Sequence, residues 1–122
     1  MAVRFKTSNP TSLLANFNKK IDQEEPKGKI TTWLRERHDN RDYYTHKAAD
    51  WTKKAWFTPV IEDGALKFNI RPPKDKVVDV RTYAYYHGHL TETFLAHFDD
   101  QFTEAVSTAK AGSGDVISDK KE

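Results

Sequence analysis

The five histidines are the residues of this sequence with the widest range of possible chemistry. His87 and His89 form a His-Gly-His sequence, and His97 follows with Asp99 and Asp100 nearby. Two imidazoles and a carboxylate can bind zinc. In a helix, however, the eight positions between His89 and His97 would span about 12 Å. We therefore assign no metal ligands and no catalytic residues, and an enzyme that uses His87 and His89 is only the last of three functional alternatives.

Other signatures of catalysis are absent from the sequence. There is no cysteine, which excludes disulfides, thiolate metal sites and cysteine nucleophiles. The sequence has no nucleophile elbow, no glycine-rich phosphate loop and no His-Glu-x-x-His motif. We therefore expect a non-catalytic protein without a cofactor.

The clearest structural signal is a β-hairpin around Asp63-Gly64. Two β-rich segments, 56–61 and 66–71, flank this dipeptide, which is typical of a type I′ turn. A two-residue loop pairs Ile61 with Leu66 and places Trp56 opposite Arg71. Residues 77–86 alternate in a similar way and predict a third strand.

One face of this predicted sheet carries aromatic and basic side chains. The alternation of side chains along the strands sends seven candidate binding residues to the same side: Trp56, Lys67, Asn69, Arg71, Arg81, Tyr83 and Tyr85. Three interpretations are open. The rings can shield the sheet, form a protein interface, since Tyr, Trp and Arg dominate such contacts, or stack on the bases of single-stranded nucleic acid.

Amphipathic helices are expected on the other face of the sheet. Asn9 and Pro10 are typical of a helix start, and apolar residues at helical spacing predict a helix over 10–23. A second helix is predicted from Thr91, with Phe94, Leu95, Phe98, Phe102, Ala105 and Val106 on one apolar arc. Residues 3–7 and 30–34 predict short strands, the first at an edge of the sheet. Residues 39–42 predict a turn, and residues 43–54 predict a loop with one or two helical turns.

These elements indicate an α+β fold. We expect a small, mostly antiparallel sheet of three or four strands with two amphipathic helices packed on one face. The sequence predicts a single domain over residues 1–108. Residues 109–122, with their Ala-Gly-Ser-Gly composition, predict a flexible C-terminal tail.

The charge distribution bears on possible partners. The net charge is +2, but residues 27–81 carry thirteen basic against eight acidic residues, and residues 82–122 carry three against seven. A split of this kind can attract an anionic partner or favour self-association. We expect a small cytoplasmic binding or regulatory domain that contacts a protein or a second copy of itself. No membrane contact is expected, and single-stranded nucleic acid is the second alternative.

Overall fold

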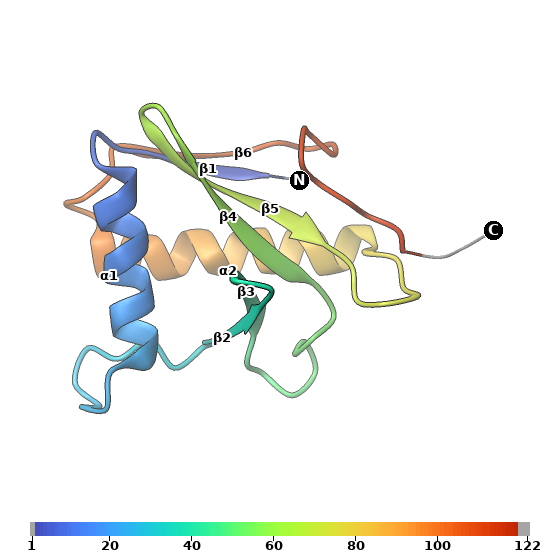
Figure 1. Cartoon of the computed structure of the whole chain (residues 1–122), viewed down its shortest axis with the longest axis horizontal. Coiled ribbons are helices and arrows are strands. Elements are labelled where there is room, and N and C mark those ends of the chain that lie inside the picture. Colours follow the sequence, from blue (N-terminus) through green and yellow to red (C-terminus); the bar gives the residue numbers. More distant parts are fainter. Residues whose placement is uncertain (1, 120–122) are drawn as a thin grey trace.

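The computed structural model describes residues 2–119, which form an α+β fold with two helices and one six-stranded antiparallel sheet. The strand order is β2-β3-β4-β5-β1-β6, and the helices α1 and α2 lie at a steep angle to each other (Figure 1). The α+β class agrees with the sequence-based expectation. The expected number of three or four strands is wrong, because β2, β3 and β6 extend the sheet on both sides.

The N-terminal part of the chain forms β1 (Val3–Lys6) and α1 (Pro10–Asp22). β1 is not an edge strand, since it pairs with β5 on one side and β6 on the other. The Asn9 side chain accepts a hydrogen bond from the Ser12 N–H at 3.2 Å, which caps α1 as expected. The buried residues Leu13, Phe17 and Ile21 form the helical stripe that faces the core.

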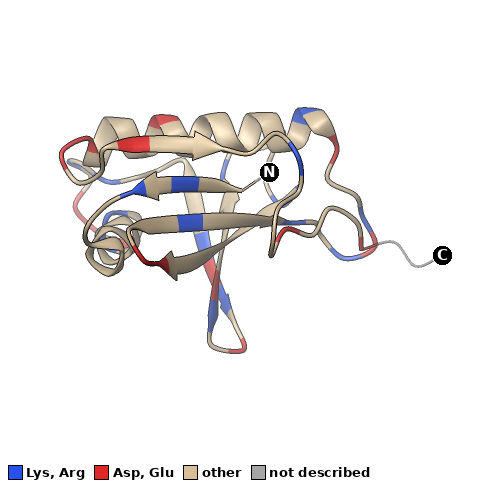
Figure 2. Ribbon diagram, turned by 90° about the horizontal axis from the view of Figure 1, so that it is seen from above, with Lys and Arg blue, Asp and Glu red and all other residues tan. Residues whose placement is uncertain are grey.

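A second hairpin is formed by β2 (Trp33–His38) and β3 (Arg41–His46). Asp39 and Asn40 join the strands with φ of 52° and 64°, the left-handed values that a type I′ turn requires. The prediction of a loop over residues 43–54 is therefore wrong for its first part. Within the described residues, the register between β3 and β4 is the single pair Tyr44–Phe57, so the hairpin diverges from the sheet. Figure 2 shows it projecting on the side away from α2.

The hairpin of β4 (Trp56–Glu62) and β5 (Ala65–Arg71) has the register that the sequence predicts. Ile61 pairs with Leu66 and Trp56 pairs with Arg71. Gly64 in the turn has φ of 78°.

Residues 80–98 form α2 (Val80–Phe98), so the predicted third strand over 77–86 is wrong. The N-cap of the helix is Asp79, twelve residues before the expected cap Thr91, and its side chain accepts a hydrogen bond from the Thr82 N–H at 2.8 Å. Tyr86, Leu90, Phe94 and Phe98 are fully buried and recur every four residues, the spacing of one helix face. This longer stripe outweighs the local β propensity of residues 77–86.

Both helices pack on one face of the sheet. The Phe68 ring of β5 lies 5.8 Å from the Phe17 ring of α1 and 5.7 Å from the Phe94 ring of α2, measured between centroids. Phe94 also stacks on Phe5 of β1 at 4.1 Å. Leu95, expected in the apolar arc, is 53% exposed. Neither helix among the described residues is long and apolar enough to cross a membrane.

After α2, the chain forms β6 (Glu104–Ser107), where the sequence predicted continuation of the helix. Residues 109–119 then run beside the end of β5 (Figure 1). The Val116 N–H donates to the Ile70 carbonyl at 2.9 Å, and the Val78 N–H donates to the Ile117 carbonyl at 2.8 Å. The flexibility expected of residues 109–122 stays a prediction. The domain boundary at residue 108 stays a prediction, and residues 120–122 of the tail lie outside the described part.

Candidate binding surface

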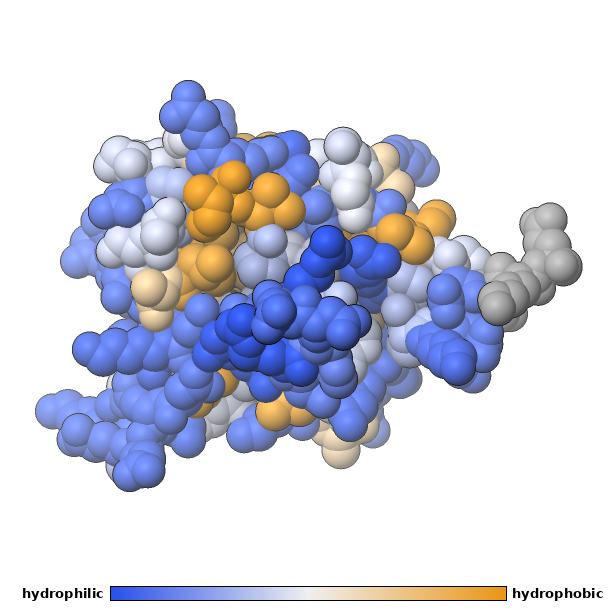
Figure 3. Space-filling view, in the orientation of Figure 1, coloured by the Kyte–Doolittle hydropathy of each residue, from blue (hydrophilic) through white to orange (hydrophobic). Residues whose placement is uncertain are grey.

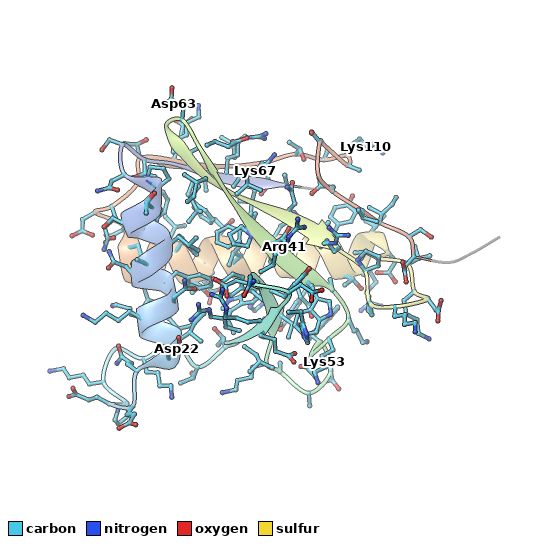
Figure 4. All side chains as sticks on the ribbon, in the orientation of Figure 1. Asp22, Arg41, Lys53, Asp63, Lys67 and Lys110 are labelled. Atoms are coloured by element: carbon cyan, nitrogen blue, oxygen red, sulfur yellow. The ribbon has the colours of Figure 1, made fainter. Side chains whose placement is uncertain are left out.

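Four of the seven predicted binding residues lie on the face of the sheet opposite the helices. Trp56 on β4 and Lys67, Asn69 and Arg71 on β5 alternate with buried residues that face the core. Trp56 and Arg71 are half-buried and are direct cross-strand partners. This outer face is turned toward the viewer in Figures 3 and 4.

Lys67 and Asn69 are on the expected face but are covered by the C-terminal segment. Lys67 is 6% exposed and Asn69 is 4% exposed. The Lys67 Nζ donates to the Ser113 carbonyl at 3.3 Å. These two side chains therefore hold another part of the same chain, and a partner reaches them only if that segment moves.

Arg81, Tyr83 and Tyr85 are not on the outer face, because they belong to α2. The Tyr83 hydroxyl donates to the Ala109 carbonyl at 3.3 Å. Tyr85 is half-buried and stacks on Trp51 at a centroid distance of 4.0 Å. The expectation of a single surface containing all seven residues is therefore corrected. These three residues belong to α2, which packs on the opposite side of the sheet from Trp56 and Arg71.

An aromatic hollow lies where the β2–β3 hairpin meets the beginning of β4. Its volume is about 720 Å³, and it is lined by the following residues: His38, Asp39, Tyr43, Trp56, Pro72, Pro73 and Lys74. The Tyr43 and Trp56 rings meet edge to face, with centroids 6.4 Å apart and an interplanar angle of 90°. Such a half-buried pair offers apolar area at a low cost in side-chain entropy.

A second, more polar hollow lies on the other side of the hairpin tip. We call it the arginine hollow; its volume is about 480 Å³, and its lining includes Arg41, Arg71, Asp42 and Val60. Figure 4 labels Arg41 and Lys67 on the face turned toward the viewer. In Figure 3, strongly hydrophilic side chains project from this face beside apolar patches. The hairpin tip thus separates an aromatic hollow from a basic one.

Ion pairs neutralise part of the basic charge on the outer face. Arg4 Nε lies 2.8 Å from Glu62 Oε1, and Lys67 Nζ lies 3.5 Å from Glu62 Oε2. The hydrogen bond from the Arg4 guanidinium holds the pKa of Glu62 below its usual value. Asp42, on the helix-facing side of the β2–β3 hairpin, pairs with Arg35 at 3.1 Å and Arg37 at 3.2 Å, and Arg35 also pairs with Asp22 of α1 at 2.6 Å. Within residues 2–119, Arg41, Arg71 and Lys74 have no ion pair.

The histidines are not brought together into one site. His87 is buried, and its ring lies 5.2 Å from the Phe57 ring. His89, two residues further along α2, stacks on Tyr85 at 4.0 Å and lies 5.1 Å from His46. In the part of the chain that the structure describes, no cluster of three or more His, Cys, Asp or Glu residues has the arrangement of a metal site.

Comparison with known proteins gives no further assignment. No protein-family model, no curated protein and no solved structure matches this chain. The outer face therefore has to be interpreted from its own residues.

Tyr43 and His38 are the surface residues that the sequence analysis missed. The alternation of Tyr43 with the buried residue Tyr44 was available in the sequence, but the segment was interpreted as a loop. The signal that identifies the hairpin is Asp39-Asn40, two residues that tolerate positive φ between two β-rich segments.

Proposed function

We propose that this chain is a small, non-catalytic binding or regulatory domain of the cytoplasm that contacts another protein through the aromatic hollow. The observation that carries the proposal is the meeting of Tyr43 and Trp56 on an outer face where Arg4 and Lys67 are paired with Glu62. Half-buried Tyr and Trp residues in a concave, mixed-charge setting are typical of the centres of protein interfaces. A second copy of the chain is the first partner to test.

The mixed charge of the surface favours a protein over a nucleic acid. Asp39 lines the aromatic hollow and Asp42 lines the arginine hollow. The Asp39 carboxylate repels phosphate groups, whereas the charge of Asp42 is compensated by Arg35 and Arg37. The perpendicular Tyr43 and Trp56 rings also do not form the parallel platforms on which successive bases stack.

Single-stranded nucleic acid is the second candidate, and one observation favours it. A hollow of about 380 Å³ adjoins the aromatic hollow through Pro73 and Lys74, and four lysines line it: Lys53, Lys54, Lys74 and Lys76. A strand of bases and phosphates would find aromatic rings and cations next to each other here.

The two candidates differ in the salt dependence of binding. We expect the mass of the full chain in solution to rise with protein concentration, and this association to persist at high salt. Trp56→Ala should weaken it by more than about fivefold, corresponding to about 1 kcal/mol at an interface centre. Val106→Ala is the matched control, because Val106 is an apolar residue, 42% exposed, on β6 at the far edge of the sheet.

A monomeric chain that binds a single-stranded oligonucleotide only at low salt would contradict the protein proposal and support the second candidate. Equal association of the Trp56→Ala and Val106→Ala variants would show that the aromatic hollow is not the interface.

A further inference from the structure

The C-terminal segment fills an open backbone edge of the sheet. β1 pairs with β5 only from Ala65 to Phe68 within the described residues, so the end of β5 has no strand beside it there. Residues 111–119, which we call the strap, occupy this place. The Ile70 N–H donates to Asp115 Oδ1 at 3.0 Å, and the Val116 N–H donates to the Ile70 carbonyl at 2.9 Å.

The segment between β5 and α2 forms the second wall. Val77 and Ser118 form an antiparallel bridge, with the Val78 N–H donating to the Ile117 carbonyl at 2.8 Å. The Asp119 N–H donates to the Lys76 carbonyl at 2.9 Å, and the Asp75 N–H donates to Asp119 Oδ2 at 2.8 Å. The strap therefore lies between two backbone edges, as an extended peptide does when it adds to a sheet.

The walls are selective for a Gly-Asp sequence. Gly114 has φ of 90°, and a Cβ there would lie 2.4 Å from the end of the Asn69 side-chain amide, so only glycine fits. The buried Asn69 amide, oriented with its nitrogen toward the strap, donates to the Ser113 carbonyl at 3.1 Å and to Asp115 Oδ1 at 3.0 Å. A carboxylate at position 115 thus receives hydrogen bonds from both a backbone and a side-chain donor.

The strap is attached by its backbone rather than by the core. None of residues 109–119 belongs to the hydrophobic core cluster, and most of the strap is exposed. Segments with few buried apolar contacts open at a lower free energy than the whole fold. Once the strap opens, the same donors and acceptors are available to an identical segment.

We propose that the strap and its walls form a peptide-binding groove that takes the C-terminal segment of a second copy of this chain. In a monomer, the chain's own strap occupies the groove and competes with the C-terminal segment of a second copy. Exchange of an identical segment keeps every contact and changes only which molecule supplies it. None of the residues that hold the strap lines the aromatic hollow, so this inference does not rest on the proposed function.

The absence of cysteine makes disulfide trapping a direct test. The probe is a synthetic peptide with the sequence of residues 111–119 and cysteine in place of Ser118. It is added to the full-length Val77→Cys chain in a thiol-disulfide redox buffer. Paired positions of antiparallel strands are about 4.5–5.5 Å apart, which a disulfide can bridge. The peptide is used at several millimolar, above the effective concentration of roughly millimolar expected for a tethered strap.

Val80→Cys is the matched control chain, because Val80 is 66% exposed and Val77 is 47% exposed, but Val80 lies in α2 outside the groove. We expect at least tenfold more mixed disulfide with Val77→Cys than with Val80→Cys, measured by mass spectrometry. A peptide that also carries Gly114→Ala should reduce the Val77→Cys yield to the control level. Adding Trp56→Ala to the chain should leave the yield unchanged.

Equal yields from the two chains, or from the two peptides, would overturn the proposal. Amide hydrogen exchange of the unmodified chain gives a second criterion. The amides of Val78, Val116 and Asp119 should exchange through openings of lower free energy than that of Phe68. Exchange of all four only by global unfolding would show that the strap does not open and would also overturn the proposal.

Discussion

At the scale of single residues, two buried histidines have one ring nitrogen each without a hydrogen-bond partner among the described residues. His46 Nδ1 accepts a hydrogen bond from the Ala48 N–H at 3.0 Å, and His87 Nδ1 lies 2.5 Å from the Tyr83 carbonyl oxygen. Within the described residues, the Nε2 atoms of both rings are buried without a hydrogen-bond partner. Burial disfavours the imidazolium form, so protonation of either residue destabilises the fold.

We predict that the free energy of unfolding decreases as the pH falls below about 7. Burial lowers the pKa of His87 from its ordinary value of 6.5. Burial and, to a smaller extent, the charge of nearby His89 lower the pKa of His46. Between each lowered pKa and 6.5, the unfolded chain binds more protons than the folded chain. The histidine contribution to the free energy of unfolding is therefore complete above pH 6.5. It declines as the pH falls through this interval and levels off below the lowered pKa.

Denaturant unfolding at pH 7 and pH 5 measures this effect. His87→Gln should reduce the difference in stability between the two pH values, whatever its effect at pH 7. A pH dependence identical to that of the unmodified chain would show that His87 does not contribute to it.

At the scale of elements, two glycines differ in backbone conformation because one lies in a turn and the other in a helix. Gly64 closes the β4–β5 hairpin with φ of 78°, whereas Gly88 lies inside α2 with an ordinary helical conformation. A Cβ at either position would meet no atom within 4 Å. The two sites therefore differ in backbone requirement and not in available space.

Substitution by alanine should have opposite effects at these two glycines. Gly64→Ala places a side chain in the left-handed region and should cost roughly 1–2 kcal/mol of stability. Gly88→Ala removes backbone freedom from the unfolded chain and should add roughly 0.5–1 kcal/mol. Thermal or denaturant unfolding of the two variants checks both values. Destabilisation by Gly88→Ala would contradict α2 as described.

At the scale of the whole molecule, the strap joins the end of β5 to the segment before α2. Its hydrogen bonds bring residues 115–119 against residues 69–78, more than 35 positions away in the sequence. These contacts connect the C-terminal segment to the sheet without adding to the hydrophobic core. The strap therefore adds moderately to the stability of the fold.

Ending the chain at Lys110 should lower the melting temperature by about 4 °C, corresponding to roughly 1 kcal/mol for a domain of this size. Gly114→Ala in the full chain should cause part of the same decrease, because its Cβ would meet Asn69. Gly112→Ala is the control, since its Cβ would make only an ordinary contact of 3.7 Å with Asp115 Oδ2. Melting temperatures unchanged by the truncation would agree with the flexible tail expected from the sequence.

Local patterns in the sequence determined the elements that depend on neighbouring residues. Asn9-Pro10 and the spacing of Leu13, Phe17 and Ile21 predicted α1, and Asp63-Gly64 predicted the register of the β4–β5 hairpin. Capping, helical periodicity and turn conformation act over a few residues. They are therefore visible without the tertiary structure.

Tertiary structure alone decided the conformation of residues 77–86 and the composition of the outer face. Arg81, Tyr83 and Tyr85 have the alternation and β propensity of a strand, but the core-facing stripe through Tyr86, Leu90 and Phe94 makes the segment helical. Lys67 and Asn69 lie on the expected face, and the strap that covers them comes from more than 40 residues further along the chain. Burial by distant segments contributes more free energy than local preference, and one sequence on its own does not reveal which segments meet.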